Sequence, residues 1–127
     1  MVRETHLLPS HLISPLFVRD GAGSPEPILS MPGMARLSEA DLFKEVEMSM
    51  ELGIRSFVLF PAVEDGLKDP IGSYGTSAEN FYLRLARSVK ERFPEVYLMS
   101  DVALDPYSSD GHDGVVRDGV VVNDVTL

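Results

Sequence analysis

Short apolar runs alternate with longer amphipathic stretches along this chain. The runs at residues 12–18, 55–61 and 96–104 predict three strands. The third run is nearly continuous, which is typical of a strand buried on both faces within a parallel sheet. Pro15 lies inside the first run and favours an edge position for that strand, because proline donates no hydrogen bond to a ladder.

Two amphipathic helices are predicted between these strands. The first begins at Ser38, a good N-cap residue, and ends at Gly53, which suits a left-handed C-terminal position. The second is predicted to begin at Thr76, which forms a capping-box pattern with Glu79, and to end at Pro94. Each helix carries apolar residues at intervals of three or four and therefore has one face for a core.

Turn-forming residues mark the connections. Residues 19–32 are rich in Gly and Pro and are predicted as a loop, as is the polar stretch 64–75. Residues 114–124 predict a β-hairpin, because Asp118-Gly119 is a two-residue type I′ turn signal between valine pairs.

The order of these elements predicts an α/β fold. Successive strand–helix units with short connections form a parallel sheet with right-handed crossovers, which places both helices on one face and leaves the other face bare. A complete TIM (β/α)₈ barrel takes about 250 residues. We therefore predict a partial TIM (β/α)₈ barrel, with the first three β/α units plus a β-hairpin, at residues 12–127. Residues 1–11 are predicted to form an N-terminal arm.

The composition of the chain limits the kinds of molecule that it is expected to bind. The chain has 127 residues, 44% of them hydrophobic, and a formal net charge of −9. That charge disfavours nucleic acids and anionic membranes as partners, since both select basic surfaces. The absence of cysteine excludes disulfides and thiolate metal sites. No apolar stretch approaches the roughly 20 residues of a membrane span, so we expect a cytoplasmic protein.

Candidate chemistry follows the third strand. Asp101 interrupts the apolar run, where a carboxylate is costly unless it is paired, hydrated or functional. Asp105, Asp110, His112 and Asp113 come next, at the strand exit where α/β folds place their active sites. Carboxylates suit a hard cation such as Mg²⁺. The alternative is ordinary turn chemistry, since Asp-Pro and Asp-Gly pairs favour turns.

Several short motifs occur in a specific order. They are Leu16-Phe17-Val18, Ser30-Met31-Pro32-Gly33, Leu52-Gly53-Ile54, Leu59-Phe60-Pro61, Lys68-Asp69 with Gly72-Ser73, Asp101-Val102-Ala103-Leu104-Asp105-Pro106-Tyr107, Gly111-His112-Asp113-Gly114 and Asn123-Asp124. This ordered set, spanning nearly the whole chain, resembles the N-terminal part of the porphobilinogen synthase (delta-aminolevulinic acid dehydratase) family.

The resemblance implies a function. Members of the family are cytoplasmic (β/α)₈ barrels that assemble into large oligomers and condense two molecules of 5-aminolevulinate to porphobilinogen, on the path to haem. It implies a catalytic, substrate-facing role for Asp101, and substrate or metal binding by Asp105 and Asp113. The cysteines of zinc-dependent members match Ala103, Asp105 and Asp113, so this chain resembles the cysteine-free branch, which uses Mg²⁺ or a monovalent cation instead of a zinc–cysteine site.

One departure from the family concerns lysine. The family forms Schiff bases on two lysines of later strands, whereas this chain has Lys44, Lys68 and Lys90 in other contexts, with acidic neighbours that favour the charged form. We therefore expect the chain to be inactive alone.

Three readings of function remain open from sequence. The first is the N-terminal part of a porphobilinogen synthase. The second is a non-catalytic fragment or interaction domain that needs a complementary chain, in line with an expected homo-oligomer or complementary partner. The third is a small carboxylate–metal hydrolase built on Asp101, Asp105, His112 and Asp113.

Overall fold

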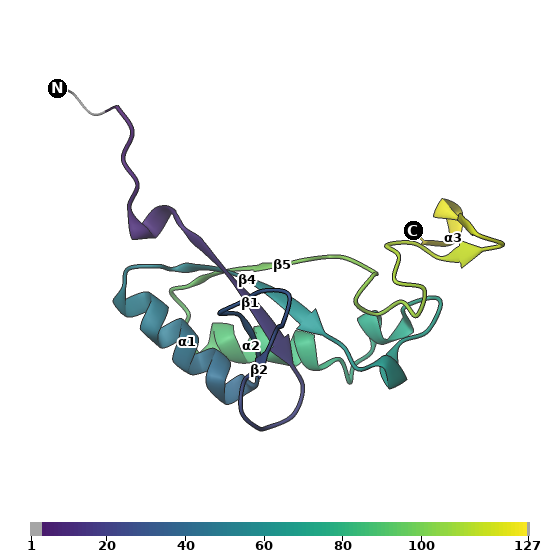
Figure 1. Cartoon of the computed structure of the whole chain (residues 1–127), viewed down its shortest axis with the longest axis horizontal. Coiled ribbons are helices and arrows are strands. Elements are labelled where there is room, and N and C mark those ends of the chain that lie inside the picture. Colours follow the sequence, from purple (N-terminus) through teal and green to yellow (C-terminus); the bar gives the residue numbers. More distant parts are fainter. Residues whose placement is uncertain (1–3, 127) are drawn as a thin grey trace.

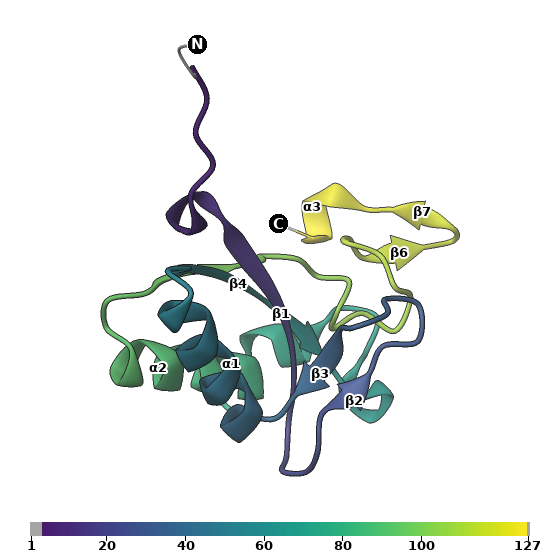
Figure 2. The same cartoon turned by 60° about the vertical axis from the view of Figure 1, so that its left-hand side comes forward.

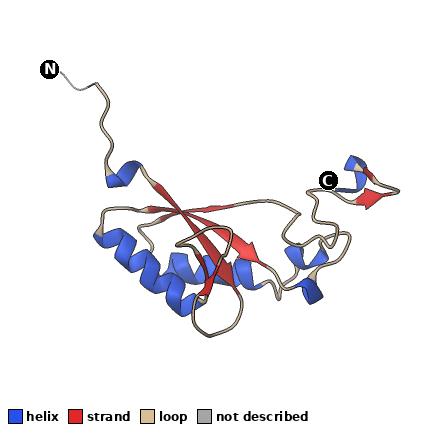
Figure 3. Ribbon diagram, in the orientation of Figure 1, coloured by secondary structure: helices blue, strands red, loops and turns tan. Residues whose placement is uncertain are grey.

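The computed structural model describes residues 4–126 and contains a five-stranded sheet in the order β2-β3-β1-β4-β5 (Figures 1 and 3). Residues 4–8 have no regular structure, and a short 3₁₀ helix, Pro9–His11, precedes the sheet. The strands are β1 (Ile13–Arg19), β2 (Glu26–Pro27), β3 (Ala35–Leu37), β4 (Ser56–Ala62) and β5 (Tyr97–Ser100).

The predicted three-stranded parallel core is confirmed. Strand β4 pairs in parallel with β1 on one side and with β5 on the other. Leu59 of β4 lies opposite Leu16 of β1 and Ser100 of β5. The three strands therefore adjoin in the order in which they occur along the chain.

The prediction of a loop at residues 19–32 is wrong in part. Strand β2 lies inside this range and pairs antiparallel with β3, which in turn pairs in parallel with β1. Strands of two and three residues are too short to show a period. The edge position favoured by Pro15 is also wrong, because β1 has a neighbour on each side. Pro15 pairs with Val58 of β4, and the pairing with β3 begins only at Phe17, so β1 has a single neighbour at the level of Pro15.

Helices α1 (Glu39–Glu51) and α2 (Phe81–Arg92) cover the same face of the sheet (Figures 1 and 2). The first begins as predicted, since the Ser38 side chain accepts a hydrogen bond from the Asp41 N–H. Gly53 follows its C-terminus with φ +90°. Among residues 4–126, no helix is both long and apolar enough to cross a membrane.

The predicted start of the second helix is wrong. Thr76 ends a short 3₁₀ helix, Ser73–Thr76, and Asn80 is the N-cap of α2. The Asn80 Oδ1 accepts from the Tyr82 N–H at 2.9 Å, while its Nδ2 donates to the Gly75 carbonyl at 3.0 Å and to the Tyr107 hydroxyl at 3.3 Å. Asn80 is 1% exposed, so contacts with distant residues determine where the helix begins.

The core lies between the sheet and the two helices. Its strand residues include Leu16, Val18, Phe57 and Leu59, and its helix residues include Leu42, Val46, Phe81, Tyr82, Leu85 and Val89. On the opposite face of the sheet, Phe17 and Phe60 stack with ring centroids 5.5 Å apart. The prediction that the third strand is buried on both faces is wrong, because β5 is the last strand of the sheet and Tyr97 is 73% exposed.

The predicted hairpin is confirmed, as strands β6 (Val116–Arg117) and β7 (Val120–Val121). Its turn has φ +51° at Asp118 and +77° at Gly119, as a type I′ turn requires. The sequence did not predict the short helix α3 (Asn123–Thr126) beyond it. The hairpin stands apart from the sheet (Figures 1 and 2).

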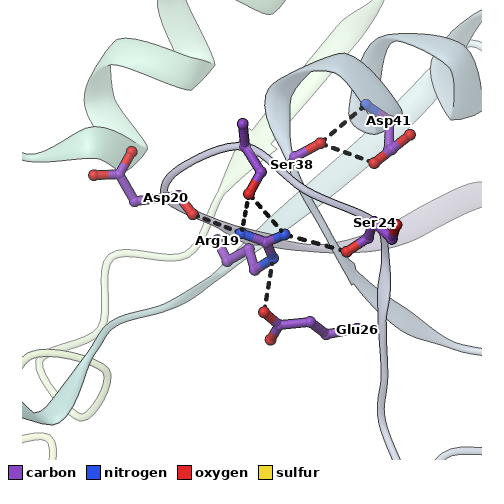
Figure 4. A network of polar contacts seen from close by, with 7 residues as sticks. Arg19, Asp20, Ser24, Glu26, Ser38 and Asp41 are labelled. Carbon is purple, nitrogen blue, oxygen red and sulfur yellow. Dashed lines mark hydrogen bonds and ion pairs between the residues drawn. The ribbon is translucent and has the colours of Figure 1, made fainter.

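Arg19, at the end of β1, holds the loop of residues 20–25 in shape (Figure 4). Its guanidinium donates to the backbone carbonyls of Asp20, Ala22 and Ser24 at 2.9–3.4 Å. Its Nε lies 3.1 Å from Glu26 Oε1, as an ion pair whose direction is not that of a hydrogen bond. One side chain therefore stabilises this Gly-rich loop, and Asp20 within the loop also pairs with Arg84 of α2 at 2.7 Å.

Candidate functional site

The candidate site lies at the carboxyl end of β5, where the chain leaves the sheet. Asp101 directly follows the last residue of β5 and is exposed. Residues 102–113 then form a loop that returns toward the same place. The position agrees with the general rule that parallel sheets carry their chemistry at the carboxyl ends of strands.

Asp113 closes this loop on itself. Its Oδ1 accepts hydrogen bonds from the backbone N–H groups of Leu104 at 3.1 Å and Asp105 at 3.2 Å. Burial, and then the charges of Asp113 and Asp101, raise the pKa of the Asp105 carboxyl. The charges of Asp113 and Asp101 therefore make the charged form of Asp105 less favourable than it is in water, and a bound cation or substrate amine would offset this effect.

An open groove of about 910 Å³ contains these carboxylates. Its lining includes residues 100–105 and Asp113, together with Tyr82 and Leu83 of α2. The groove is both apolar and acidic. It offers a small molecule carboxylate oxygens for an amine or a cation, beside a hydrophobic surface.

The loop that follows β4 is joined to the site loop through its backbone. Asp69 N–H donates to the Tyr107 carbonyl at 3.2 Å, and the Asp69 carbonyl accepts from Ser109 N–H at 3.0 Å. The Asp69 carboxylate accepts from the Ser73 hydroxyl and from the N–H groups of Ser73 and Ile71. These contacts, Ser73 first, lower the pKa of Asp69. The sequence contains the Lys68-Asp69 and Gly72-Ser73 motifs in this loop, but it did not show that Asp69 bonds to the backbone of Tyr107 and Ser109.

The other polar residues of the segment do not join the carboxylates in a metal cluster. Asp110 and His112 are exposed. Within residues 4–126, no three His, Cys, Asp or Glu side chains gather closely enough to hold a metal ion. The hydrolase reading therefore lacks the cluster it needs. A cation held by Asp105 and Asp113 alone would take its remaining ligands from water or substrate.

The lysines occupy the kinds of position predicted, on helices and in a loop, and contact acceptors away from the groove. Lys44 Nζ lies 3.1 Å from Asp41, and Lys68 Nζ lies 2.8 Å from Asp65 rather than beside Asp69. Lys90 Nζ donates to the carbonyls that follow α2, with the shorter contact, 2.7 Å, to Val96.

Comparison with known proteins extends across the chain. A sequence model of the delta-aminolevulinic acid dehydratase family matches residues 1–127. The delta-aminolevulinic acid dehydratase of Chlamydia pneumoniae is 44% identical over 127 residues, covering 100% of this chain and 38% of that protein. The chloroplastic protein of Hordeum vulgare is 46% identical, covering 98% of this chain and 29% of the relative.

Solved structures give the same answer. The crystal structure of delta-aminolevulinic acid dehydratase (porphobilinogen synthase) from Toxoplasma gondii ME49, in complex with the reaction product porphobilinogen, matches with a TM-score of 0.93 and 49% identity. The match covers 98% of this chain and 36% of the other, and confirms the predicted partial TIM barrel. The chain spans about a third of the length of these relatives, corresponding to their N-terminal part. It belongs to the delta-aminolevulinic acid dehydratase family.

Proposed function

We propose that this chain forms part of a porphobilinogen synthase, which condenses two molecules of 5-aminolevulinate to porphobilinogen. The observation that carries the proposal is the match, at a TM-score of 0.93, to a family member in complex with that product. The placement of Asp101 at the exit of β5, inside an acidic groove, supports it.

The carboxylates divide the work in this proposal. Asp101 faces the substrate and orients its amino group, since a carboxylate at a strand end binds an ammonium ion or takes up its proton. Asp105 and Asp113 bind the substrate or a hard cation, Mg²⁺ or a monovalent ion. Carboxylate oxygens are the ligands that such a cation prefers, and the negative charge of Asp113 lies beside Asp105. When bound, the cation would neutralise that charge.

The chain alone does not supply the amine of this reaction. An imine forms when an unprotonated lysine attacks the substrate ketone and water leaves, and an ordinary lysine is almost fully protonated at neutral pH. Lys44 and Lys68 pair with carboxylates, and Lys90 donates to backbone carbonyls. We infer that the nucleophilic lysines come from outside residues 1–127, and that the isolated chain makes no porphobilinogen.

Borohydride trapping tests this inference. The chain is incubated with 5-aminolevulinate and Mg²⁺, reduced, and analysed by mass spectrometry, with a colour assay for pyrrole alongside. We expect neither a reduced adduct nor pyrrole. A stoichiometric adduct on any of the three lysines, together with pyrrole, would mean that this part of the barrel assembles a complete site. A full-length relative treated in the same way is the positive control.

A second candidate function is that of an interaction domain which pairs with a complementary chain or with further copies of itself. The face of the sheet opposite α1 and α2 favours it, because Phe17 and Phe60 stack there and both are only half-buried. Mixing the chain with the C-terminal two-thirds of a relative, expressed separately, tests this. Restored pyrrole formation would support both candidates. Stable binding without pyrrole would support the interaction domain alone, and absence of binding would contradict it.

A further inference from the structure

Asp69 joins the loop that follows β4 to the middle of the site loop. Its N–H donates to the Tyr107 carbonyl at 3.2 Å, and its carbonyl accepts from the Ser109 N–H at 3.0 Å. Ser108, between these two partners, is 2% exposed and forms a parallel bridge with Asp69. Two backbone hydrogen bonds from one residue therefore hold the site loop where it is buried.

The carboxylate of Asp69 gives the turn that follows it a fixed shape. Its Oδ1 accepts from the N–H groups of Ile71 at 2.9 Å and Ser73 at 3.1 Å, and its Oδ2 accepts from the Ser73 hydroxyl. The Asp69 carbonyl also accepts from the Gly72 N–H at 3.1 Å. An aspartate that hydrogen-bonds the backbone two residues on is typical of a turn. Because the same carbonyl accepts from Ser109, the shape of this turn sets the direction of a bond to the site loop.

The turn also packs against the start of the site loop. Gly72 lies so close to the Leu104 side chain that a Cβ at this position would overlap it. The Leu104 N–H donates to Asp113 Oδ1 at 3.1 Å, and the same oxygen accepts from the Asp105 N–H at 3.2 Å. Contacts therefore run without a break from the turn at Asp69, through Leu104, to Asp113.

We propose that Asp69 is a positioning residue, whose carboxylate fixes the turn and thereby holds the site loop so that Asp105 and Asp113 stay beside each other. This rests on the proposed role of these two carboxylates in binding substrate or a cation. A carboxylate that stabilised only its own turn could be removed without any effect on the backbone at Asp105.

Amide hydrogen exchange in the full chain, read by NMR, tests the contacts without requiring activity. In the wild type, the Ser109 and Asp105 amides should exchange at least about tenfold more slowly than in an unfolded peptide, since a hydrogen bond must open before exchange. Asp69→Ala keeps the backbone groups and removes the carboxylate. It should speed exchange at both amides by about three- to tenfold relative to Tyr97, which corresponds to one neutral hydrogen bond. The Tyr97 amide donates to the Arg55 carbonyl at 2.8 Å and reports on the sheet.

Two variants are the controls. Asp65→Ala removes a carboxylate of the same loop, which pairs with Lys68 at 2.8 Å, and it should leave exchange at Ser109 and Asp105 unchanged. Asp69→Asn keeps a side-chain oxygen that can accept from backbone N–H groups, so it should retain most of the wild-type protection.

Three results would overturn the proposal. The first is a Ser109 amide that is unprotected in the wild type, and this measurement does not depend on whether a variant folds. The second is an equal effect of Asp69→Ala at Ser109 and Tyr97, which would show a general loss of stability. The third is an effect at Ser109 without one at Asp105, which would confine the role of the carboxylate to its own turn.

Binding of Mg²⁺ separates this proposal from the proposed function. The Asp105 amide signal is followed while Mg²⁺ is added to the chain. Asp69→Ala should weaken the binding at least about threefold, because the two carboxylates would have to be ordered on binding. Asp65→Ala removes the same charge and should not weaken it, and equal binding by the wild type and Asp69→Ala would contradict the positioning role. No response in the wild type would contradict cation binding by Asp105 and Asp113, and the exchange measurement would still decide whether Asp69 holds the site loop.

Discussion

Replacing Asn80 with alanine should destabilise the chain well beyond the loss of a helix cap. Asn80 makes one capping hydrogen bond, to Tyr82 N–H at 2.9 Å, and two further bonds through its amide nitrogen, to the Gly75 carbonyl and the Tyr107 hydroxyl. The residue is 1% exposed, so water cannot replace these contacts without opening the structure.

The expected magnitude follows from these contacts. Loss of an N-cap costs about 1 kcal/mol. Leaving a buried partner such as the Tyr107 hydroxyl without its hydrogen bond costs about 1–3 kcal/mol more. We therefore expect Asn80→Ala to lower the free energy of unfolding by about 2–4 kcal/mol. The pKa of Tyr107 should also rise further, because the hydrogen bond from Asn80 is what lowers it against the larger effect of burial.

Urea unfolding followed by circular dichroism measures the first effect, and ultraviolet titration of the phenol measures the second. Ser38→Ala is the matched control, because Ser38 caps α1 and its other side-chain hydrogen bond is also to Asp41, within the same turn. We expect it to cost about 1 kcal/mol. If Asn80→Ala costs no more than Ser38→Ala, the contacts that join α2 to the site loop carry no weight, and the reasoning is refuted.

Three further predictions concern the site loop and the sheet. Burial and a neighbouring carboxylate raise the pKa of Asp105 above 3.8, so its contribution to stability is present below that pH and is lost as pH rises. The urea midpoint of the wild type should therefore fall relative to that of Asp105→Asn between acid and neutral pH. A difference between the two midpoints that stays constant with pH would contradict this. Gly72→Ala should lower the free energy of unfolding by about 1–2 kcal/mol, because Gly72 has φ +63° and a Cβ there would overlap the Leu104 side chain. Gly66→Ala should leave the free energy of unfolding nearly unchanged, because a Cβ at Gly66 meets no atom within 4 Å, and equal effects of the two substitutions would refute the argument. The wild type should self-associate or bind a hydrophobic dye, and Phe60→Ser should reduce this; a compact, dye-negative wild-type monomer in sedimentation would contradict it.

The elements predicted from the sequence are those long enough to show a regular pattern of apolar residues. Strands β1, β4 and β5 are apolar runs separated by amphipathic helices, so their order and parallel pairing could be inferred. Strands β2 and β3 are too short for any period to appear. The start of α2 was missed because Thr76 and Asn80 are both good caps, and the choice depends on Tyr107, 27 residues beyond Asn80.

The carboxylates of the candidate site could be predicted from the sequence, but the residues that hold the neighbouring elements in place could not. Asp101 and Asp105 stood out because carboxylates at the end of an apolar run need a reason to be there. Tyr82 gave no such signal, since a tyrosine on the apolar face of a helix reads as core. The hydrogen bond from the Tyr82 hydroxyl to the Leu59 carbonyl forms only once α2 packs against the sheet. The backbone junction of Asp69 with the site loop is likewise a product of the tertiary fold.

The two borders of the sheet are protected very differently, and this bears on how the chain behaves during synthesis. One border is β2, two exposed residues with a charge at Glu26 and no donor at Pro27, features that discourage further pairing. The other is β5, four residues without charge or proline. Strand β5 is the last strand of this sheet to be synthesised, so the border without charge or proline forms last. We expect chaperones, and misassembly in their absence, to act at β5 on the nascent chain.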